Sequence, residues 1–309
     1  PTYMPELPEV QTTVSGLKKI LPGLSFVDVW TDMWSEARIA KNTIKDKSYF
    51  SYFKKHVLGQ TVIDVRRRAK HILIDLDNGF TMIIHMKMTG HLMYGHYVQN
   101  KKYNGREWSW IPVAKATPLL DPYNRHIHVV FTLSDHHHLA FCDSRKFGTI
   151  VVEQTATLHT ERFANLGPEP LETAFTLLEL KKRIMKSPGR AIKTVLMDQL
   201  IISGIGNIYS DEMLHRAHIL PMRTPRSLND SELKLLFTAL KEVLLKGIDF
   251  GGDSTSDYRN IQGESGKFHE NHLVYLRTSK PCTRRMCPGI IHKKTIGGRS
   301  AHFCPVCQK

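Results

Sequence analysis

Residues 281–309 read PCTRRMCPGIIHKKTIGGRSAHFCPVCQK and contain four of the five cysteines in the chain. These cysteines form two close pairs, Cys282 with Cys287 and Cys304 with Cys307. Two such pairs on a strand–turn–strand segment present four thiolates to one tetrahedral zinc ion. The segment is rich in Lys, Arg and Gly, so metal binding would have to supply much of its folding free energy. The sequence therefore predicts a zinc finger with one structural Zn²⁺.

Other cysteine chemistries fit the pattern less well. Disulfides are disfavoured because the chain shows no secretory signal peptide, and a redox pair at Cys304 and Cys307 would leave Cys282 and Cys287 unexplained. An iron–sulfur centre also uses four thiolates, and spacing alone leaves it open. The fifth cysteine, Cys142, is predicted to be a buried small side chain.

The composition indicates a globular chain that binds nucleic acid rather than a membrane. With 309 residues, the chain exceeds one typical core, which favours two domains plus the small metal unit. The hydrophobic fraction is 41%, and no apolar run reaches membrane-spanning length. A net charge of +14 and a pI of about 9.5 favour a polyanion, with nucleic acid ahead of a membrane surface.

The first half of the chain is predicted to be an antiparallel sandwich with flanking helices. Short β-branched or aromatic runs, separated by turn signals, occur at Leu24–Trp30, His71–Leu76, Phe80–Met86, His128–Leu133 and Thr149–Val152. Helices are expected at Pro8–Leu21 and Lys47–Leu58, and a long surface loop at Gly95–Pro122. From Leu171 the apolar period becomes helical, at Phe175–Lys186, Arg190–Gln199, Asn207–Ala217 and Ser231–Phe250. The join is expected near Thr155–Pro170.

The segment MPELPEV, residues 4–10, offers a nucleophile. Removal of an initiator Met at position 4 would expose the secondary amine of Pro5, and terminal amines have a pKa of about 7.7 to 8.0. Attack on a sugar C1′ would give an iminium ion, and the adjacent Glu6 could protonate the sugar oxygen. The alternative is a plain helix start, with Pro8 in the first turn and Glu6 and Glu9 stabilised by the macrodipole.

Seven short stretches, spread over nearly the whole chain, share the order and spacing of one family. They are residues 5–10, 67–70, 85–90, 143–148, 166–171, 204–209 and 282–309. In these stretches the chain resembles the bacterial formamidopyrimidine-DNA glycosylases, also called 8-oxoguanine DNA glycosylase/AP lyases.

The resemblance implies four catalytic residues. Pro5 would be the Schiff-base nucleophile, Glu6 the proton donor beside it, and Lys70 the group acting during β-elimination. Arg299 would bind phosphate and assist δ-elimination. As alternatives, Lys70 could hold a phosphate after the basic run 66–68, and Arg299 could pair structurally within a basic hairpin.

The resemblance also implies residues that fill the stack vacated by an extruded nucleotide: Met88, Arg145 and Phe147. Core packing is the usual fate of Met and Phe, yet both adjoin glycine turns here. Asn207, after the glycines of a helix-two-turns-helix element, would contact the DNA backbone or simply cap its helix. Weaker DNA-contact assignments fall on His126, Lys193 and Tyr209. Residues 136–138, three histidines, are predicted to form a hairpin tip.

The glycine-rich stretch 251–268 would be the loop that closes over the extruded base in this family. A plain linker has the same composition. Departures from the family are the residues Pro1–Tyr3 before Met4, the four-residue cysteine spacing, Lys146 in place of arginine, and a long 95–122 loop. Pro1–Tyr3 would leave Pro5 an amide, so the working protein is expected to begin at Pro5.

Together these features predict a multi-domain α+β protein. Its parts are a β-sandwich catalytic domain at 4–155, a helix-two-turns-helix domain with the lesion loop at 156–270, and a zinc finger at 271–309. The expected activity is excision of oxidised purines with β,δ-elimination. The alternatives are an endonuclease VIII-like glycosylase for oxidised pyrimidines and a non-catalytic zinc-dependent DNA-binding protein. The protein is expected to be a monomer that binds damaged double-stranded DNA and no membrane. Its expected location is the cytoplasm, in association with the nucleoid.

Overall fold

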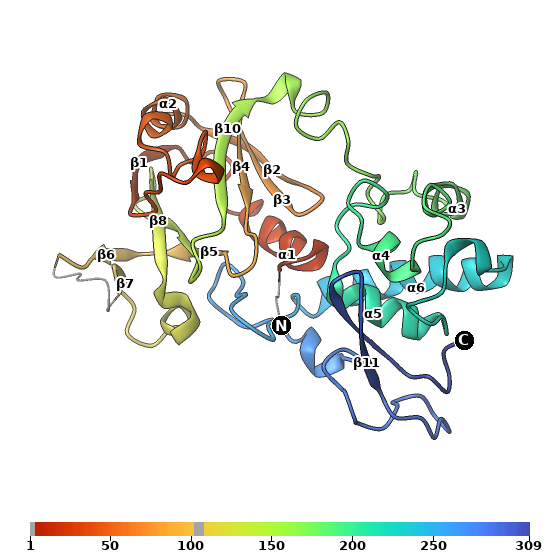
Figure 1. Ribbon diagram of the computed structural model, residues 1–309. Coiled ribbons are helices and arrows are strands. Elements are labelled where there is room, and N and C mark those ends of the chain that lie inside the picture. Colours follow the sequence, from red (N-terminus) through yellow and green to blue (C-terminus); the bar gives the residue numbers. More distant parts are fainter. Residues whose placement is uncertain (1–3, 102–107) are drawn as a thin grey trace. The chain divides into compact units, whose positions relative to one another are not determined.

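The computed structural model describes residues 4–101 and 108–309 and divides into two compact units. The first unit runs to Ala164 and includes the later segment Gly251–Lys267. The second unit comprises Asn165–Phe250 and Phe268–Lys309. In Figure 1 the first unit is coloured mainly red to light green, and the second green to blue.

Two four-stranded antiparallel sheets form the centre of the first unit (Figure 1). One sheet has the order β1-β8-β9-β5, with strands Phe26–Thr31, Ile127–Leu133, His138–Cys142 and His91–Gly95. The other has the order β10-β4-β3-β2, with strands Thr149–Gln154, Phe80–His85, His71–Leu76 and Val62–Arg68. Every pairing within them is antiparallel, and short turns join β2 to β3, β3 to β4 and β8 to β9.

The core lies between the two sheets, where apolar side chains of both meet in one buried cluster. Phe131 of β8 and Ile74 of β3 are both fully buried in this cluster. Helix α1 (Leu7–Leu17) adds Val10 and Val14, and helix α2 (Lys47–Val57) adds Phe53. The predicted antiparallel sandwich with flanking helices is therefore confirmed.

The stretch predicted as a loop at Gly95–Pro122 contains more structure than its sequence indicates. Strands β6 (Tyr97–Gln99) and β7 (Trp110–Pro112) pair in a short ribbon, whose connecting residues 102–107 lie outside the described part of the chain. Two 3-10 turns follow, η2 (Pro118–Leu120) and η3 (Pro122–Arg125). Tyr97 and Leu119 pack with residues of β5, β8 and β9 in a second buried cluster. The prediction of a plain loop was wrong because tertiary burial of these aromatic side chains outweighs their missing periodicity.

The second unit is helical, with α3 (Leu177–Ile184), α4 (Ile192–Leu196), α5 (Asn207–Arg216) and α6 (Asp230–Asp249). Asn229 caps α6 by accepting from the amide of Glu232, whose carboxylate accepts from the Asn229 amide in return. The segment between α4 and α5 carries Gly204 in the left-handed region at φ +87°. The four helices predicted from Leu171 onward are all present; α3, α4 and α5 have shorter bounds, and α6 is shifted by one residue.

A two-stranded hairpin, β11 (His292–Ile296) and β12 (Arg299–Phe303), completes the second unit. Its turn is formed by Gly297 and Gly298, both at positive φ. A Cβ on Gly297 would lie 2.5 Å from the Thr194 side chain, so the hairpin tip packs closely on α4. Only glycine fits both the φ angle and this close approach.

The expected fold class is confirmed in its main features. The boundaries 155/156 and 270/271 stay a prediction, whereas residues 251–267 group with the sandwich by their contacts. Within residues 4–101 and 108–309, no helix combines the length and apolar character that a membrane crossing requires.

Candidate active site

The candidate nucleophile stands directly before helix α1. Pro5 is buried, and Glu6 occupies the N-cap position with only 2% of its surface exposed. The Glu6 amide donates to the Glu9 carboxylate at 2.8 Å, and the other Glu9 oxygen accepts from the Asp253 amide at 2.7 Å. Glu9 therefore joins the start of the chain to the 251–267 loop. The alternative interpretation of residues 4–10, as the start of a helix, also agrees with this geometry. A residue at the start of α1 can have a catalytic role as well.

Lys70 lies in the turn between β2 and β3, on the same unit as Pro5 and Glu6. The strands pair from Arg68 to His71, which leaves Ala69 and Lys70 as the two turn residues. Arg67 donates to the Ala69 carbonyl at 2.9 Å and fixes the turn. Lys70 itself is 8% exposed, which is unusual for a lysine and is better suited to a site than to a solvated face.

The three candidate void-filling residues lie together. A guanidinium nitrogen of Arg145 is 3.3 Å from the Met88 sulfur, and the guanidinium lies over the Phe147 ring at 4.5 Å from its centroid. Met88 stands in the turn between β4 and β5, while Arg145 and Phe147 belong to the connection between β9 and β10. Phe147 is 47% exposed, so it is not a core residue. A half-buried Met88 and an exposed Phe147 around one arginine suit insertion into a base stack.

Three non-glycine residues in these turns have left-handed backbones, which are rare for L residues. They are Ala69 at φ +52°, Lys87 at φ +56° and Lys146 at φ +54°. Each directly precedes a candidate site residue, namely Lys70, Met88 and Phe147. Strain of this kind persists where surrounding contacts hold it, and here it coincides with the candidate site.

Asp143 is a functional residue that sequence reasoning did not single out. Its buried carboxylate accepts from the Thr89 hydroxyl, from the Arg145 amide at 3.3 Å and from the Gly148 amide at 2.7 Å. It thereby ties the Met88 turn to the turn that bears Arg145 and Phe147. The stretch DSRKFG, residues 143–148, was the available signal, because an Asp before a turn accepts hydrogen bonds from the amides that follow it.

His126 follows η3 and is half-buried, with its Nε2 3.1 Å from the Arg125 Nε. Burial lowers the pKa of His126 first, and the nearby Arg125 charge adds to this effect. The ring is therefore a neutral acceptor or donor at physiological pH, rather than a cation for phosphate. The histidine run 136–138 spans the β8–β9 turn and the first residue of β9, as expected for a hairpin tip.

A buried histidine near this region gives the first unit a pH dependence. His91 is fully buried, its Nε2 lies 2.9 Å from Asn124 Oδ1, and burial lowers its pKa to about 4. The unfolded chain protonates at an ordinary pKa of about 6.5, so the unfolded state gains the proton first. Stability is thus complete above about pH 6.5, falls by about 3 kcal/mol toward pH 4, and levels off below.

We expect His91→Gln to lose this part of the pH dependence, because glutamine can still meet Asn124 but does not titrate. Urea unfolding at pH 7 and pH 4.5 measures the difference, with the exposed His159→Gln as the matched control. An unchanged pH slope in His91→Gln would contradict the assignment.

In the second unit, Asn207 is the first residue of α5, and Gly206 holds the N-cap position. The proposed capping by Asn207 was therefore misplaced by one residue. Its amide nitrogen instead lies 3.3 Å from the Tyr275 hydroxyl and 3.4 Å from the Ser300 hydroxyl. No described group donates to its buried Oδ1. Asn207 thus links the start of α5 to the hairpin that carries Arg299.

Lys193 and Tyr209 are fully buried. The Lys193 ammonium forms an ion pair with Asp211 and donates to the Asn207 carbonyl at 3.3 Å. The Tyr209 ring stacks on Phe268 with centroids 4.9 Å apart. Either side chain would have to be uncovered before it could touch a phosphate, so both support the site from within. Arg299 is exposed at the start of β12, in the second unit.

The four cysteines of the finger lie together and could hold a metal ion. Their sulfur atoms lie within 4.8 Å of one another, with 3.7 Å between Cys282 and Cys307 and between Cys287 and Cys304. These distances are far longer than a disulfide bond of about 2.05 Å. The donor set is four thiols, as a single thiophilic ion requires. Cys142 is apart from them and 1% exposed, so its predicted burial is confirmed.

Comparison with known proteins defines the class. Residues 4–150 match the family model described as the formamidopyrimidine-DNA glycosylase N-terminal domain, and residues 166–259 match its H2TH domain. The protein is therefore an enzyme of the DNA glycosylase/AP lyase class, carrying a helix-two-turns-helix domain.

Individual relatives agree over the whole chain. The formamidopyrimidine-DNA glycosylase of Pelotomaculum thermopropionicum is 38% identical, with 99% of each chain covered. The Lactococcus lactis Fpg in complex with abasic-site DNA has a TM-score of 0.80 at 28% identity, covering 98% of this chain and 99% of that one. The same wild-type enzyme with N7-benzyl-Fapy-dG DNA has a TM-score of 0.79 at 29% identity, covering 99% and 100%. The chain belongs to the formamidopyrimidine-DNA glycosylase family.

Proposed function

We propose that this protein removes oxidised purines, such as 8-oxoguanine and formamidopyrimidines, from duplex DNA and then cleaves the strand by β- and δ-elimination. The strongest support is the cluster in which the exposed Arg145 contacts both the half-buried Met88 and the exposed Phe147, in a turn that Asp143 fixes. Such a cluster suits the gap that an extruded nucleotide leaves behind. Solved complexes of the Lactococcus relative contain abasic-site DNA and N7-benzyl-Fapy-dG DNA, which agrees with this substrate class.

The proposed reaction begins at Pro5, in a chain whose first residue is Pro5. Its secondary amine attacks the sugar C1′, and the bond between C1′ and the damaged base breaks with its electron pair going to the base, which takes up the proton that the Pro5 nitrogen releases. Glu6 donates a proton to the ring oxygen as the sugar opens, which leaves a cationic iminium between Pro5 and C1′. The positive charge acidifies the C2′ proton. Its loss expels the 3′ phosphate, and a second elimination expels the 5′ phosphate.

The remaining residues handle charge and position. Lys70, in the strained turn between β2 and β3, would act during β-elimination. Arg299 would neutralise phosphate charge during δ-elimination, and Asn207 would hold the DNA backbone at the start of α5. His126 would complete the DNA contacts from the first unit. Lys193 and Tyr209 would contribute by holding α4, α5 and the 3-10 turn η6 (Phe268–Asn271) in place.

Zinc is the metal that the four cysteines suit best. Zinc–sulfur bonds of about 2.3 Å in a tetrahedron place neighbouring sulfurs about 3.8 Å apart. The sulfur distances of 3.7 Å agree with this value. The ion would be structural, because the four cysteines fill its coordination and leave no open position for substrate.

Borohydride trapping on a duplex that contains 8-oxoguanine tests the proposal. A protein that begins at Pro5 is expected to form a covalent adduct, and one extended by residues 1–4 is expected to form none, because its Pro5 nitrogen is an amide. A parallel duplex with an oxidised pyrimidine tests the endonuclease VIII-like alternative. Tight, salt-sensitive binding without any adduct from the Pro5-start protein would support the non-catalytic alternative instead.

A further inference from the structure

The loop Gly251–Lys267 is folded onto the first unit along its whole length. Gly251 and Gly252 turn the chain at φ +72° and +86° directly after α6. The Tyr258 side chain is 4% exposed and its hydroxyl donates to the Glu9 carbonyl at 3.0 Å. The Ile261 carbonyl accepts from the Tyr94 amide at 2.8 Å. The loop therefore has its own buried anchors and is more than a linker.

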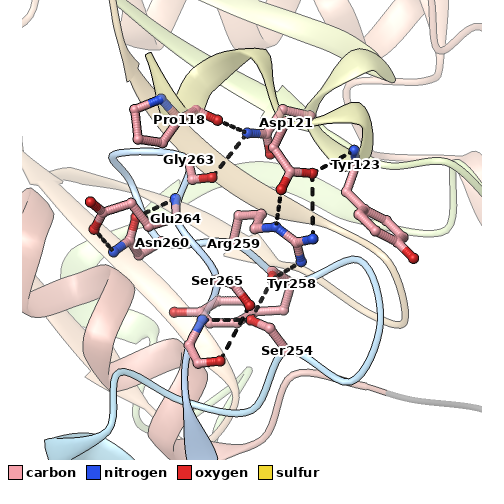
Figure 2. Close-up of polar contacts among 12 residues, drawn as sticks. Pro118, Asp121, Tyr123, Ser254, Tyr258, Arg259, Asn260, Gly263, Glu264 and Ser265 are labelled. Carbon is pink, nitrogen blue, oxygen red and sulfur yellow. Dashed lines mark hydrogen bonds and ion pairs between the residues drawn. The ribbon is translucent and has the colours of Figure 1, made fainter. Parts of the chain in front are cut away.

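Arg259 makes polar contacts both within this loop and with the η2–η3 segment (Figure 2). Its side chain is 6% exposed, and its Nε lies 3.2 Å from a carboxylate oxygen of Asp121. One terminal nitrogen donates to the Ser256 and Tyr258 carbonyls at 2.9 and 2.8 Å. The guanidinium also lies over the Tyr123 ring, 4.4 Å from its centroid. The planar fork of arginine can satisfy all these partners together.

The η2–η3 segment, which carries Asp121, also holds the loop through Asn124. Asn124 donates from one amide nitrogen to the Pro118 carbonyl at 3.0 Å and to the Gly263 carbonyl at 3.2 Å (Figure 2). A Cβ on Gly263 would stand 2.8 Å from Asn124 and from the Leu119 backbone. The loop and the η2–η3 segment are thus in direct backbone contact, which only glycine permits at this φ of +85°.

The other side of the loop reaches the void-filling turn. Ser144, next to Arg145, donates from its hydroxyl to the Asp257 carboxylate at 2.6 Å. Asp257 stands two residues before Arg259. The arginine therefore fixes the part of the loop that contacts the turn bearing Ser144 and Arg145. A movement of the Arg259 region would therefore reach both the loop and the neighbourhood of Arg145.

We propose that Arg259 is a positioning residue for damage recognition, acting through loop 251–267 with Asp121 and Tyr123 as its support. This inference rests on the proposed function and on the loop covering the extruded base, as the family resemblance implies. A loop held by a buried arginine paired with the half-buried Asp121 is already ordered when the base arrives, and its fixed shape selects among bases. The substrate part concerned is the oxidised purine itself, and the sugar and phosphates are handled elsewhere.

The role predicts a split between two substrates. Excision of 8-oxoguanine requires the base to be held, whereas cleavage of an abasic duplex has no base for the loop to cover. In Arg259→Met we expect single-turnover excision to slow by roughly 10- to 100-fold, with abasic cleavage within about threefold of the wild type. Arg259→Lys should recover part of the excision rate, because it retains the charge but not the fork.

The loop itself provides a readout independent of activity. Hydrogen exchange of the amides from Asp253 to Gly266 should become faster by about tenfold or more in Arg259→Met. Arg216→Met is the matched control, since it removes an exposed arginine paired with Glu242 at the far end of α5 from Asn207. It should leave both the loop exchange and the substrate ratio unchanged.

Three outcomes would overturn the inference. Unchanged exchange in Arg259→Met would show that the ion pair does not hold the loop. Equal losses on both DNA substrates would indicate a general structural role, and an unchanged excision rate would remove the role in recognition. Failure of the proposed function looks different: the wild type would then cleave neither substrate, and the recognition role would fall with it, whatever the exchange result.

Discussion

Cys304→Ser is expected to unfold the hairpin β11–β12 and to abolish DNA binding at physiological salt. The finger has a small apolar core, in which Val274, Ile291 and Cys304 are the buried members. Four-cysteine zinc sites of this size contribute about 10 kcal/mol or more to folding. Loss of the hairpin would remove Arg299 and release the partner of Asn207 on β12, Ser300. We expect the dissociation constant for damaged duplex DNA to increase by at least about 100-fold.

Metal content, limited proteolysis of the 271–309 segment and duplex binding measure this effect together. Cys142→Ser is the matched control, because Cys142 is a buried cysteine outside the metal cluster. The control should keep one metal ion per chain and an intact hairpin. If Cys304→Ser also retained stoichiometric metal and hairpin protection, the assignment of the four cysteines as a required ligand set would be wrong.

Glu6→Gln is expected to lower the rate of base excision by roughly 100- to 10,000-fold, the usual contribution of a general acid. Glutamine keeps the size of the side chain and can still serve at the N-cap position of α1, so the fold should change little. The loss should appear in single-turnover excision of 8-oxoguanine, with duplex affinity nearly unchanged. A split of this kind separates proton transfer from binding.

Glu153→Gln provides the comparison, since Glu153 forms an ion pair with Arg162 near the surface of the same unit. Its excision rate should match the wild type. If the Glu6→Gln protein excises at the wild-type rate, Glu6 serves only to cap the helix, and another group is the proton donor.

The sequence predicted the parts of the fold that depend on local patterns. Short β-branched or aromatic runs between turn signals identified β3, β4 and β8, and the helical period identified α5 and α6. Strand β2 was missed because VIDVRRR ends in three arginines, and its pairing with β3 supplies the missing stabilisation. Strands β6 and β7 were missed because their aromatic residues pack on distant strands.

The candidate site follows the same rule. The identities of Pro5, Met88 and Phe147 could be taken from local motifs, whereas the way the turns are held could not. Ala69, Lys87 and Lys146 adopt left-handed backbones without being glycine, so their sequence gives no sign of it. The contact between Arg259 and Asp121 joins residues 138 positions apart, and no local pattern indicates such a pair.

The carboxylates of helix α5 bear on how the finger can be treated experimentally. Glu212 accepts from the amides of Leu273, Val274 and Tyr275, and Asp211 accepts from the amide and ring of His302. All these groups are buried or nearly so, and an isolated peptide 271–309 would leave the amides without these acceptors. The finger is therefore no transplantable module: a chimaera that exchanges it between relatives must exchange α5 as well.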